Sequence, residues 1–486
     1  MYKKLAKQTI IYSIGSIFPK IINYIFLKFF TFSLRRGEFS LYTDMYSLSF
    51  LAIGFVSFGL ESAYFRFLYE KKYDKKTVFS TGLILQFFIS TIFFIISTNC
   101  KNYLIHISGY SNHSEYFIMF FLIVFFDTIS IIPMAWLRVN EKPLYYITIN
   151  IIVVFIQSIL VFYMFFVYKN FRMSHNHYLL IIYKIVNSFT DRTGYIFFSN
   201  VISSIINFLL VIPILFYEFF LYKFNKVLAR KMLYYGMSIM FGTIIYSINE
   251  NLDKILIKRF ISDEINGAYS ACYKISSFIS LYQKVFRLGI EPFFFKKSND
   301  SDAIYYYEEI TYFFMLFGLI FYVLLCSNIP IFIQNIISKK YHSAISIIPI
   351  IMMGYLLLGI YTNLSILYKT INKPFVGTFC SLIGLFITLF FNTIFILISK
   401  KNFMIPAWGT FFSYGSMLFA LYIWILKKFR NFFTKKIKNI LFHLFLAIFT
   451  IFSTKKNEVE INFIYQFLYL FIIFIFEKKR LLNLFK

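Results

Sequence analysis

Apolar residues occur along almost the whole chain in long blocks that are separated by short polar stretches. A helix that crosses a bilayer needs about 20 apolar residues, because it rises ~1.5 Å per residue. The blocks have this length, so the pattern predicts an all-α polytopic membrane protein with about fourteen transmembrane helices. The expected segments lie near residues 8–32, 41–65, 77–99, 116–137, 143–168, 194–222, 232–257, 267–295, 305–334, 343–368, 374–398, 405–426, 437–453 and 461–476.

Two short motifs recur within this pattern. Residues 37–40 resemble residues 267–270, and residues 138–143 resemble residues 369–374, at offsets of 230 and 231 residues. A shared offset indicates that a unit of several helices was duplicated. Six helices per unit give both units the same orientation, so we expect a pseudo-twofold axis along the membrane normal. Duplicated bundles of this kind are typical of transporters, with the substrate site between the halves.

The repeat divides the chain into three expected parts. The N-terminal six-helix lobe is residues 1–222, and the C-terminal six-helix lobe is residues 223–426. Residues 427–486 hold two further transmembrane helices that fall outside the duplication.

Composition excludes a soluble protein. Of the 486 residues 59% are hydrophobic and only 15% are charged, too few to cover that much apolar surface. The net charge of +27 does not indicate nucleic-acid binding, because the lysines lie in short clusters between apolar segments. Those clusters predict the orientation instead: one side carries 28 Lys and Arg and the other 15, which places both termini in the cytoplasm.

No enzyme motif is present in the sequence. We find no phosphate-binding glycine loop, no nucleophile elbow, no metal-ligand spacing and no nucleotide-binding cassette. The four cysteines lie far apart, and we expect them to be small core residues. The sequence therefore predicts no catalytic residue, no metal and no cofactor, and a transport process that does not use ATP directly.

Ionisable residues inside the apolar segments are the candidate functional groups, because a charge at the bilayer centre costs at least a few kcal/mol. Lys20, Lys28, Lys254 and Lys274 are candidates for binding an anionic group such as phosphate. Lys20 is the most conspicuous, since it lies in mid-helix beside Pro19 without an acidic residue within one turn.

The acidic candidates Asp127, Glu250 and Asp253 have two interpretations, ion coupling or a structural role. Asp127 stands alone in a very apolar stretch, and we slightly favour a hydrogen-bonded structural acid there. Glu250 precedes Lys254 by four residues, a spacing at which the two side chains can neutralise each other on one helix. Asp44 lies near a helix start, where the helix dipole favours a carboxylate.

The chain resembles the bacterial O-antigen and capsule flippase branch of the multidrug/oligosaccharidyl-lipid/polysaccharide exporter superfamily. The residues that carry the resemblance are 5–16 with Pro19 and Lys20, 37–42, 58–67, 252–257, 266–275, Asn392 and 406–410. They extend over the first twelve segments.

The resemblance implies two six-helix lobes around a cavity that opens alternately to each side of the bacterial cytoplasmic membrane. The implied substrate is a polyprenyl-diphosphate-linked oligosaccharide for lipopolysaccharide or capsule synthesis, moved from the inner to the outer leaflet. Basic residues in the first helix and in the second lobe contact the diphosphate in this family, and Lys20 and Lys254 match them. The implied partners are this lipid, the membrane lipids and the polysaccharide polymerase or ligase machinery.

Other functions remain open at this stage. The lipid II flippase branch has fourteen spans, which makes export of the peptidoglycan precursor the main alternative. Cation-coupled drug export predicts an excess of acidic cavity residues, whereas the isolated charges here are mostly basic. A scaffold that no longer transports would not need the buried lysines. A membrane glycosyltransferase would need an acidic loop site, but the longest loop offers only Asp191.

Overall fold

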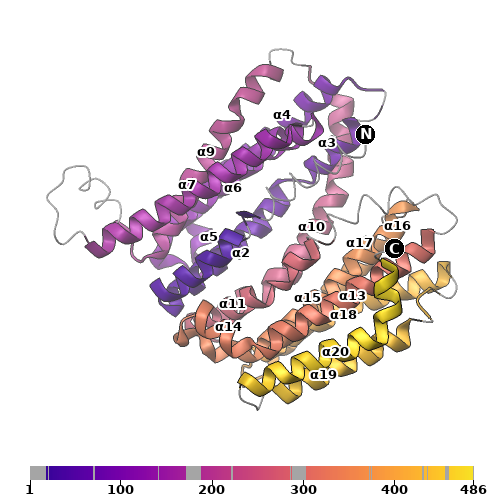
Figure 1. Ribbon diagram of the computed structural model, residues 1–486. Helices are drawn as coiled ribbons and strands as arrows, with labels where there is room; N and C mark the ends of the chain where they lie inside the picture. Colours follow the sequence, from indigo (N-terminus) through magenta and orange to yellow (C-terminus); the bar gives the residue numbers. More distant parts are fainter. Residues whose placement is uncertain are drawn as a thin grey trace. The chain divides into compact units, whose positions relative to one another are not determined.

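The structure is a computed structural model (Figure 1). It describes residues 18–19, 21–68, 70, 72–140, 142–170, 188–219, 223–284, 286, 303–371, 373, 375–429, 432–434, 436–454 and 459–484. Within these residues the chain is helical and contains no β-strand, which confirms the prediction of an all-α membrane protein.

The described helices run through both halves of the chain. The first half contains α2 (Arg36–Val56), α3 (Leu60–Leu68), α4 (Lys75–Asn99), α5 (Lys101–Ser108), η1 (Ser111–His113), α6 (Ser114–Val139), α7 (Pro143–Asn170), α9 (Thr193–Phe219) and α10 (Lys226–Phe260). The second half contains α11 (Asp263–Ser276), α13 (Ala303–Ser327), α14 (Ile329–Ile336), η3 (Lys339–Ile347), α15 (Ile348–Leu364), α16 (Ile366–Thr370), α17 (Phe375–Leu397), α18 (Met404–Lys428), α19 (Ile437–Thr454) and α20 (Val459–Leu484).

Eleven helical stretches in the described residues are long and apolar enough to cross a membrane. Three of the fourteen expected segments are not among them. The first and eighth lie partly outside the described residues, and only a shorter apolar helix, Ile21–Ser33, is described of the first. The seventh is α10, a 35-residue helix whose polar and charged residues lower its hydropathy. The count of fourteen stays a prediction.

The chain forms two compact units. The first contains Met1–Phe26 and Ser33–Arg259, and the second contains Leu27–Phe32 and Phe260–Lys486. By these contacts α10 belongs to the first unit, whereas the repeat assigned residues 223–260 to the C-terminal lobe. The division into lobes of residues 1–222 and 223–426 with an appended pair at 427–486 therefore stays a prediction from the repeat.

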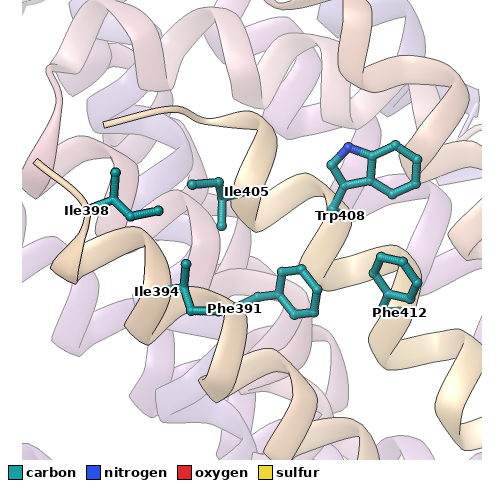
Figure 2. Close-up of a pocket in the computed structure, with 6 residues that line it drawn as sticks. All are labelled: Phe391, Ile394, Ile398, Ile405, Trp408 and Phe412. Carbon is teal, nitrogen blue, oxygen red and sulfur yellow. The ribbon is translucent and has the colours of Figure 1, made fainter. Parts of the chain in front are cut away.

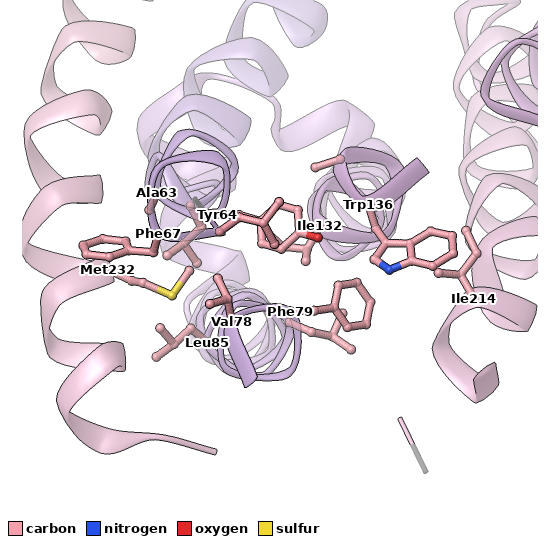
Figure 3. Packing of buried hydrophobic residues seen from close by; sticks show 14 of the residues in the cluster. Ala63, Tyr64, Phe67, Val78, Phe79, Leu85, Ile132, Trp136, Ile214 and Met232 are labelled. Atoms are coloured by element: carbon pink, nitrogen blue, oxygen red, sulfur yellow. The ribbon is translucent and has the colours of Figure 1, made fainter. Parts of the chain in front are cut away.

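Buried aromatic and aliphatic side chains form the core of the first unit (Figure 3). The ring of Phe79 on α4 lies between those of Tyr64 on α3 and Trp136 on α6, with centroids 6.2 Å and 6.4 Å away. Met232 of α10 and Ile214 of α9 belong to the same cluster. The cluster thus joins these five helices and α7, because each turns an apolar face to the same interior.

The second membrane segment is broken between α2 and α3. Residues 57–59 form a turn in which Phe58 and Gly59 have φ values of 49° and 63°. The turn lies directly against α10: a Cβ added to Gly236 would be 2.4 Å from the carbonyl oxygen of Phe58. Two glycines are therefore required here, Gly59 for its left-handed backbone and Gly236 for the close approach of two backbones.

Gly236→Ala is expected to destabilise the protein by about 1–3 kcal/mol, because the added methyl group must displace backbone rather than a flexible side chain. The measurement is the melting temperature of the purified protein in detergent. Gly242→Ala, on the same helix, is the matched control, since nothing lies within 4 Å of a Cβ built there. Equal melting temperatures for the two variants would contradict the close approach.

The second unit packs α15 and α17 against α18, and α19 and α20 against α13. A cluster of polar groups, here the Glu477 cluster, joins the last two helices to α13. Glu477 on α20 is buried and accepts a hydrogen bond from the Tyr312 hydroxyl of α13. Its Oε1 lies 3.1 Å from Nε2 of His443 on α19, and its Oε2 lies 3.3 Å from Nη1 of Arg480. Charge and hydrogen bonds thus connect three helices in an otherwise apolar setting.

Candidate functional site

A run of buried polar residues marks the second half of α10 and is called here the α10 polar segment, residues 247–254. Its buried members are Ser247, Asn249, Asn251, Asp253 and Lys254. Among the described residues, Ser247 Oγ and Asn249 Oδ1 have no hydrogen-bond partner although both atoms are buried. Buried polar groups normally have partners, so these two atoms indicate a place where a polar ligand or water fits.

Lys254 is the only one of the four predicted lysines that is buried among the described residues, with 8% of its surface exposed. Its Nζ lies 3.3 Å from Oδ1 of Asp253 and donates a hydrogen bond to the backbone carbonyl of Glu250, one turn earlier. The sequence predicted a side-chain pair with Glu250, and that pair stays a prediction; the carboxylate of the neighbouring Asp253 also lies beside Lys254. Two carboxylates and one ammonium group therefore share two turns of α10.

The other predicted lysines lie elsewhere. Lys20 is outside the described residues, so its expected mid-helix position is not described. Lys28 belongs to the short helix Ile21–Ser33 and is exposed, while Lys274 on α11 is half-buried. Among the described residues, Lys254 lies on α10 together with two other predicted site residues, Glu250 and Asp253. A diphosphate role for any of the four remains a prediction.

Asp127 lies on α6 within the first unit and is half-buried. The side chain of Ser204 on α9 is hydrogen-bonded to its carboxylate, and Tyr46 of α2 lies close by. Tyr46 is in turn hydrogen-bonded to Gln157 of α7. Asp127 thus has polar neighbours on two other helices, α9 and α2, and both of its predicted interpretations stay open.

Sequence analysis missed a buried polar chain that starts at the break between α2 and α3. Gln86 on α4 donates from Nε2 to the carbonyl of Val56, the last residue of α2, at 3.1 Å. The same nitrogen lies 3.1 Å from Ser90, and Ser90 lies 2.8 Å from the Thr128 hydroxyl on α6. Within the described residues the Gln86 Oε1 atom is buried without a partner. An amide in the middle of an apolar segment was the available signal.

A second missed feature, the Asp44 cluster, holds the end of α10 against α2. Asp44 is fully buried, and its Oδ2 accepts a hydrogen bond from the Tyr110 hydroxyl at 2.5 Å. Lys258 Nζ lies 3.2 Å from Oδ2, and Arg259 Nη1 lies 3.3 Å from Oδ1. The ammonium group of Lys258 also lies 3.8 Å from the centre of the Tyr110 ring. The sequence assigned both basic residues to a connection, so this ion pairing was not anticipated.

Basic residues at the other end of the second membrane segment interact with α3 and with aromatic rings. Arg138 at the end of α6 forms an ion pair with Glu61 of α3. Arg66 lies over the ring of Tyr235 on α10, 4.4 Å from its centre. These residues are partly exposed, and they tie the ends of three helices together in the first unit.

A family model described as a polysaccharide biosynthesis protein matches residues 5–296. No curated protein sequence matches the chain significantly. Among solved structures, the inward closed conformation of the lipid II flippase MurJ is similar at a TM-score of 0.68 and 18% identity, covering 97% of this chain and 100% of that one.

Two MATE transporters are similar as well. The multidrug transporter DinF-BH has a TM-score of 0.60 and 16% identity, with 89% of this chain and 96% of that one covered. The transporter ClbM in complex with Rb⁺ has a TM-score of 0.57 and 15% identity, with 88% and 94% covered. At these identities the likeness shows a shared fold.

Proposed function

Because the chain belongs to the polysaccharide biosynthesis protein family, we propose that it is a flippase for a polyprenyl-diphosphate-linked oligosaccharide, acting in the cytoplasmic membrane of a bacterium. It is a multi-pass membrane protein with the transporter fold of its structural neighbours. In this proposal it catalyses no covalent reaction, and both termini lie in the cytoplasm. The oligosaccharide would pass to the polymerase or ligase machinery of polysaccharide synthesis.

The observation that carries the proposal is Lys254, a cation that is buried on α10 beside polar atoms without partners among the described residues. Buried ionisable groups in membrane helices are costly, so they are retained where a ligand or a partner needs them. A diphosphate carries more charge than the single Asp253 carboxylate and can accept hydrogen bonds from several donors at once. Lys254 and the amides of Asn249 and Asn251 are the donors that the α10 polar segment offers.

In this proposal the diphosphate binds the α10 polar segment while the polyprenyl chain stays in the bilayer. Alternating access would come from rocking of the two six-helix lobes. The membrane potential acting on bound charge is a sufficient source of energy, at ~2.3 kcal/mol per elementary charge per 100 mV.

The test is translocation of a fluorescent polyprenyl-diphosphate oligosaccharide by the protein in proteoliposomes, with Lys254→Ala and Lys254→Arg as variants. We expect the alanine variant to lose about tenfold to a hundredfold in rate, the value of one hydrogen bond between charged groups. The arginine variant should retain most activity, because it keeps the charge. Lys226→Ala, an exposed lysine at the start of the same helix, is the control.

Two results would count against the proposal. Equal rates for Lys254→Ala and Lys226→Ala would remove Lys254 from the substrate site. A parallel fall in the melting temperature of Lys254→Ala would assign Lys254 a structural role, as the partner of Asp253. Lys20→Ala, assayed in the same way, tests the other matching lysine of the family resemblance.

Two alternatives are tested with the same vesicles. Lipid II as the only translocated lipid would make this protein a lipid II flippase, as MurJ is named. A cation-coupled drug exporter is favoured by one observation, the two carboxylates Glu250 and Asp253 on two turns of α10. It predicts that a cationic dye is transported under a sodium or proton gradient, and that Asp253→Asn abolishes that transport.

A further inference from the structure

The α17–α18 hairpin of the second unit carries an apolar groove of about 400 Å³ (Figure 2). The groove is lined by Phe391, Ile394, Ile398, Ile405, Trp408 and Phe412. Their side chains come from both arms of the hairpin (Figure 2). The indole nitrogen of Trp408 is the only polar side-chain atom among the six.

The groove is open to the outside of the molecule. Ile398, Trp408 and Phe412 are 39%, 41% and 47% exposed. Both helices have the length and hydropathy of membrane spans, so exposed apolar side chains along them face hydrocarbon rather than water. An apolar groove in hydrocarbon surroundings suits a hydrocarbon chain.

The positive charge of the α17–α18 hairpin favours a lipid with an anionic headgroup. The connection between the groove residues Ile398 and Ile405 contains Lys400 and Lys401, and residues 375–428 contain no Asp or Glu at all. Lys401 donates from Nζ to the carbonyls of Phe395 and Ile396 at the end of α17. Lys400 is exposed. The end of the groove thus carries positive charge with no carboxylate on the hairpin to balance it.

Trp408 supports the same placement. Tryptophan is enriched where membrane hydrocarbon meets the headgroups. Trp408 lies in the second turn of α18, which begins at Met404, so its ring is near the connection that carries the lysines. The apolar groove, the Trp408 indole and the two lysines therefore lie in the same order as the acyl chain, the interfacial region and the headgroup of a lipid.

We propose that this groove binds an anionic phospholipid of the surrounding bilayer, with an acyl chain along Phe391, Ile394 and Phe412 and the phosphate beside Lys400. The bound molecule is a lipid of the membrane, distinct from the transported lipid. The proposal therefore holds whichever substrate the protein moves.

The test uses Trp408 as a fluorescent reporter, since the chain has only three tryptophans. Trp136→Phe and Trp424→Phe leave Trp408 alone, and the protein is placed in nanodiscs of phosphatidylcholine. Brominated phosphatidylglycerol is expected to quench Trp408 at a lower mole fraction than brominated phosphatidylcholine. Lys400→Ala should reduce this preference about fivefold, the contribution of one lysine near an anionic lipid surface. Lys427→Ala, exposed at the far end of α18, should not change it.

Equal quenching by the two brominated lipids would overturn the proposal, because equal quenching indicates a contact with bilayer lipids of any headgroup. A preference that survives Lys400→Ala would overturn the assignment of the phosphate. If Trp136→Phe unfolds the protein, the signal is taken as the difference between proteins with Trp408 and with Trp408→Phe. That comparison tests the same two points, the preference for the anionic lipid and its dependence on Lys400.

Discussion

Asp44→Asn is expected to lower the free energy of unfolding by about 3–5 kcal/mol, the cost of breaking a buried ion pair by removing one partner. Asparagine keeps the size of the side chain and its acceptor for the Tyr110 hydroxyl, so the variant isolates the charge. Lys258 would then remain as a nearly buried cation, with 10% of its side chain exposed and no carboxylate from α2. The measurement is the melting temperature of the purified protein in detergent.

Asp74→Asn is the matched control, because Asp74 is exposed and makes no side-chain cap for α4. The control should melt with the unchanged protein. Combining Asp44→Asn with Lys258→Met also removes the ammonium group that pairs with Asp44, and it should restore part of the loss. The ion-pair interpretation is refuted if Asp44→Asn melts with its control, or if the double variant is no more stable than the single one.

The Glu477 cluster carries the second large effect. Glu477→Gln removes a buried charge that is hydrogen-bonded to three side chains. It should lower the free energy of unfolding by several kcal/mol. A double-mutant cycle with His443→Gln isolates the contact between α19 and α20. We expect a coupling free energy of about 0.5–3 kcal/mol, the range for residues in one hydrogen-bond network.

Glu70→Gln serves as the control for this cycle, since Glu70 is a half-exposed carboxylate in the connection between α3 and α4. Additive effects of Glu477→Gln and His443→Gln would show that the two side chains do not interact. In that case apolar packing alone would hold the last two helices on α13.

The outline of the fold could be predicted because it depends on local composition. The length of each apolar segment is visible in the sequence, and the hydrocarbon core of a bilayer favours helical backbone there. The repeated motifs lie at comparable points: α2 begins at Arg36 just before residues 37–40, α7 begins at Pro143, and α17 begins at Phe375 directly after Pro374. At these points the helix ends coincide with polar connections, so the sequence was sufficient to predict where the helices begin.

The break between α2 and α3 was not predicted, because apolar residues continue through it. Only the approach of Gly236 on α10 shows why the turn lies at Gly59. Similarly, Lys258 and Arg259 follow an apolar segment and read as residues of a connection. Their partner Asp44 is more than 200 residues away in sequence, at a distance that no local pattern reports.

By itself the sequence determined that this is an all-α membrane protein built on a repeat, since hydropathy and motif spacing are properties of single segments. It also singled out Lys254 and Asp127 as ionisable groups within apolar segments. Only the tertiary structure decided which distant groups meet: Asp44 with the end of α10, and Glu477 with His443. Pairing is a property of two segments in contact, and side-chain charge acts over a few ångströms, so it follows from packing rather than from order along the chain.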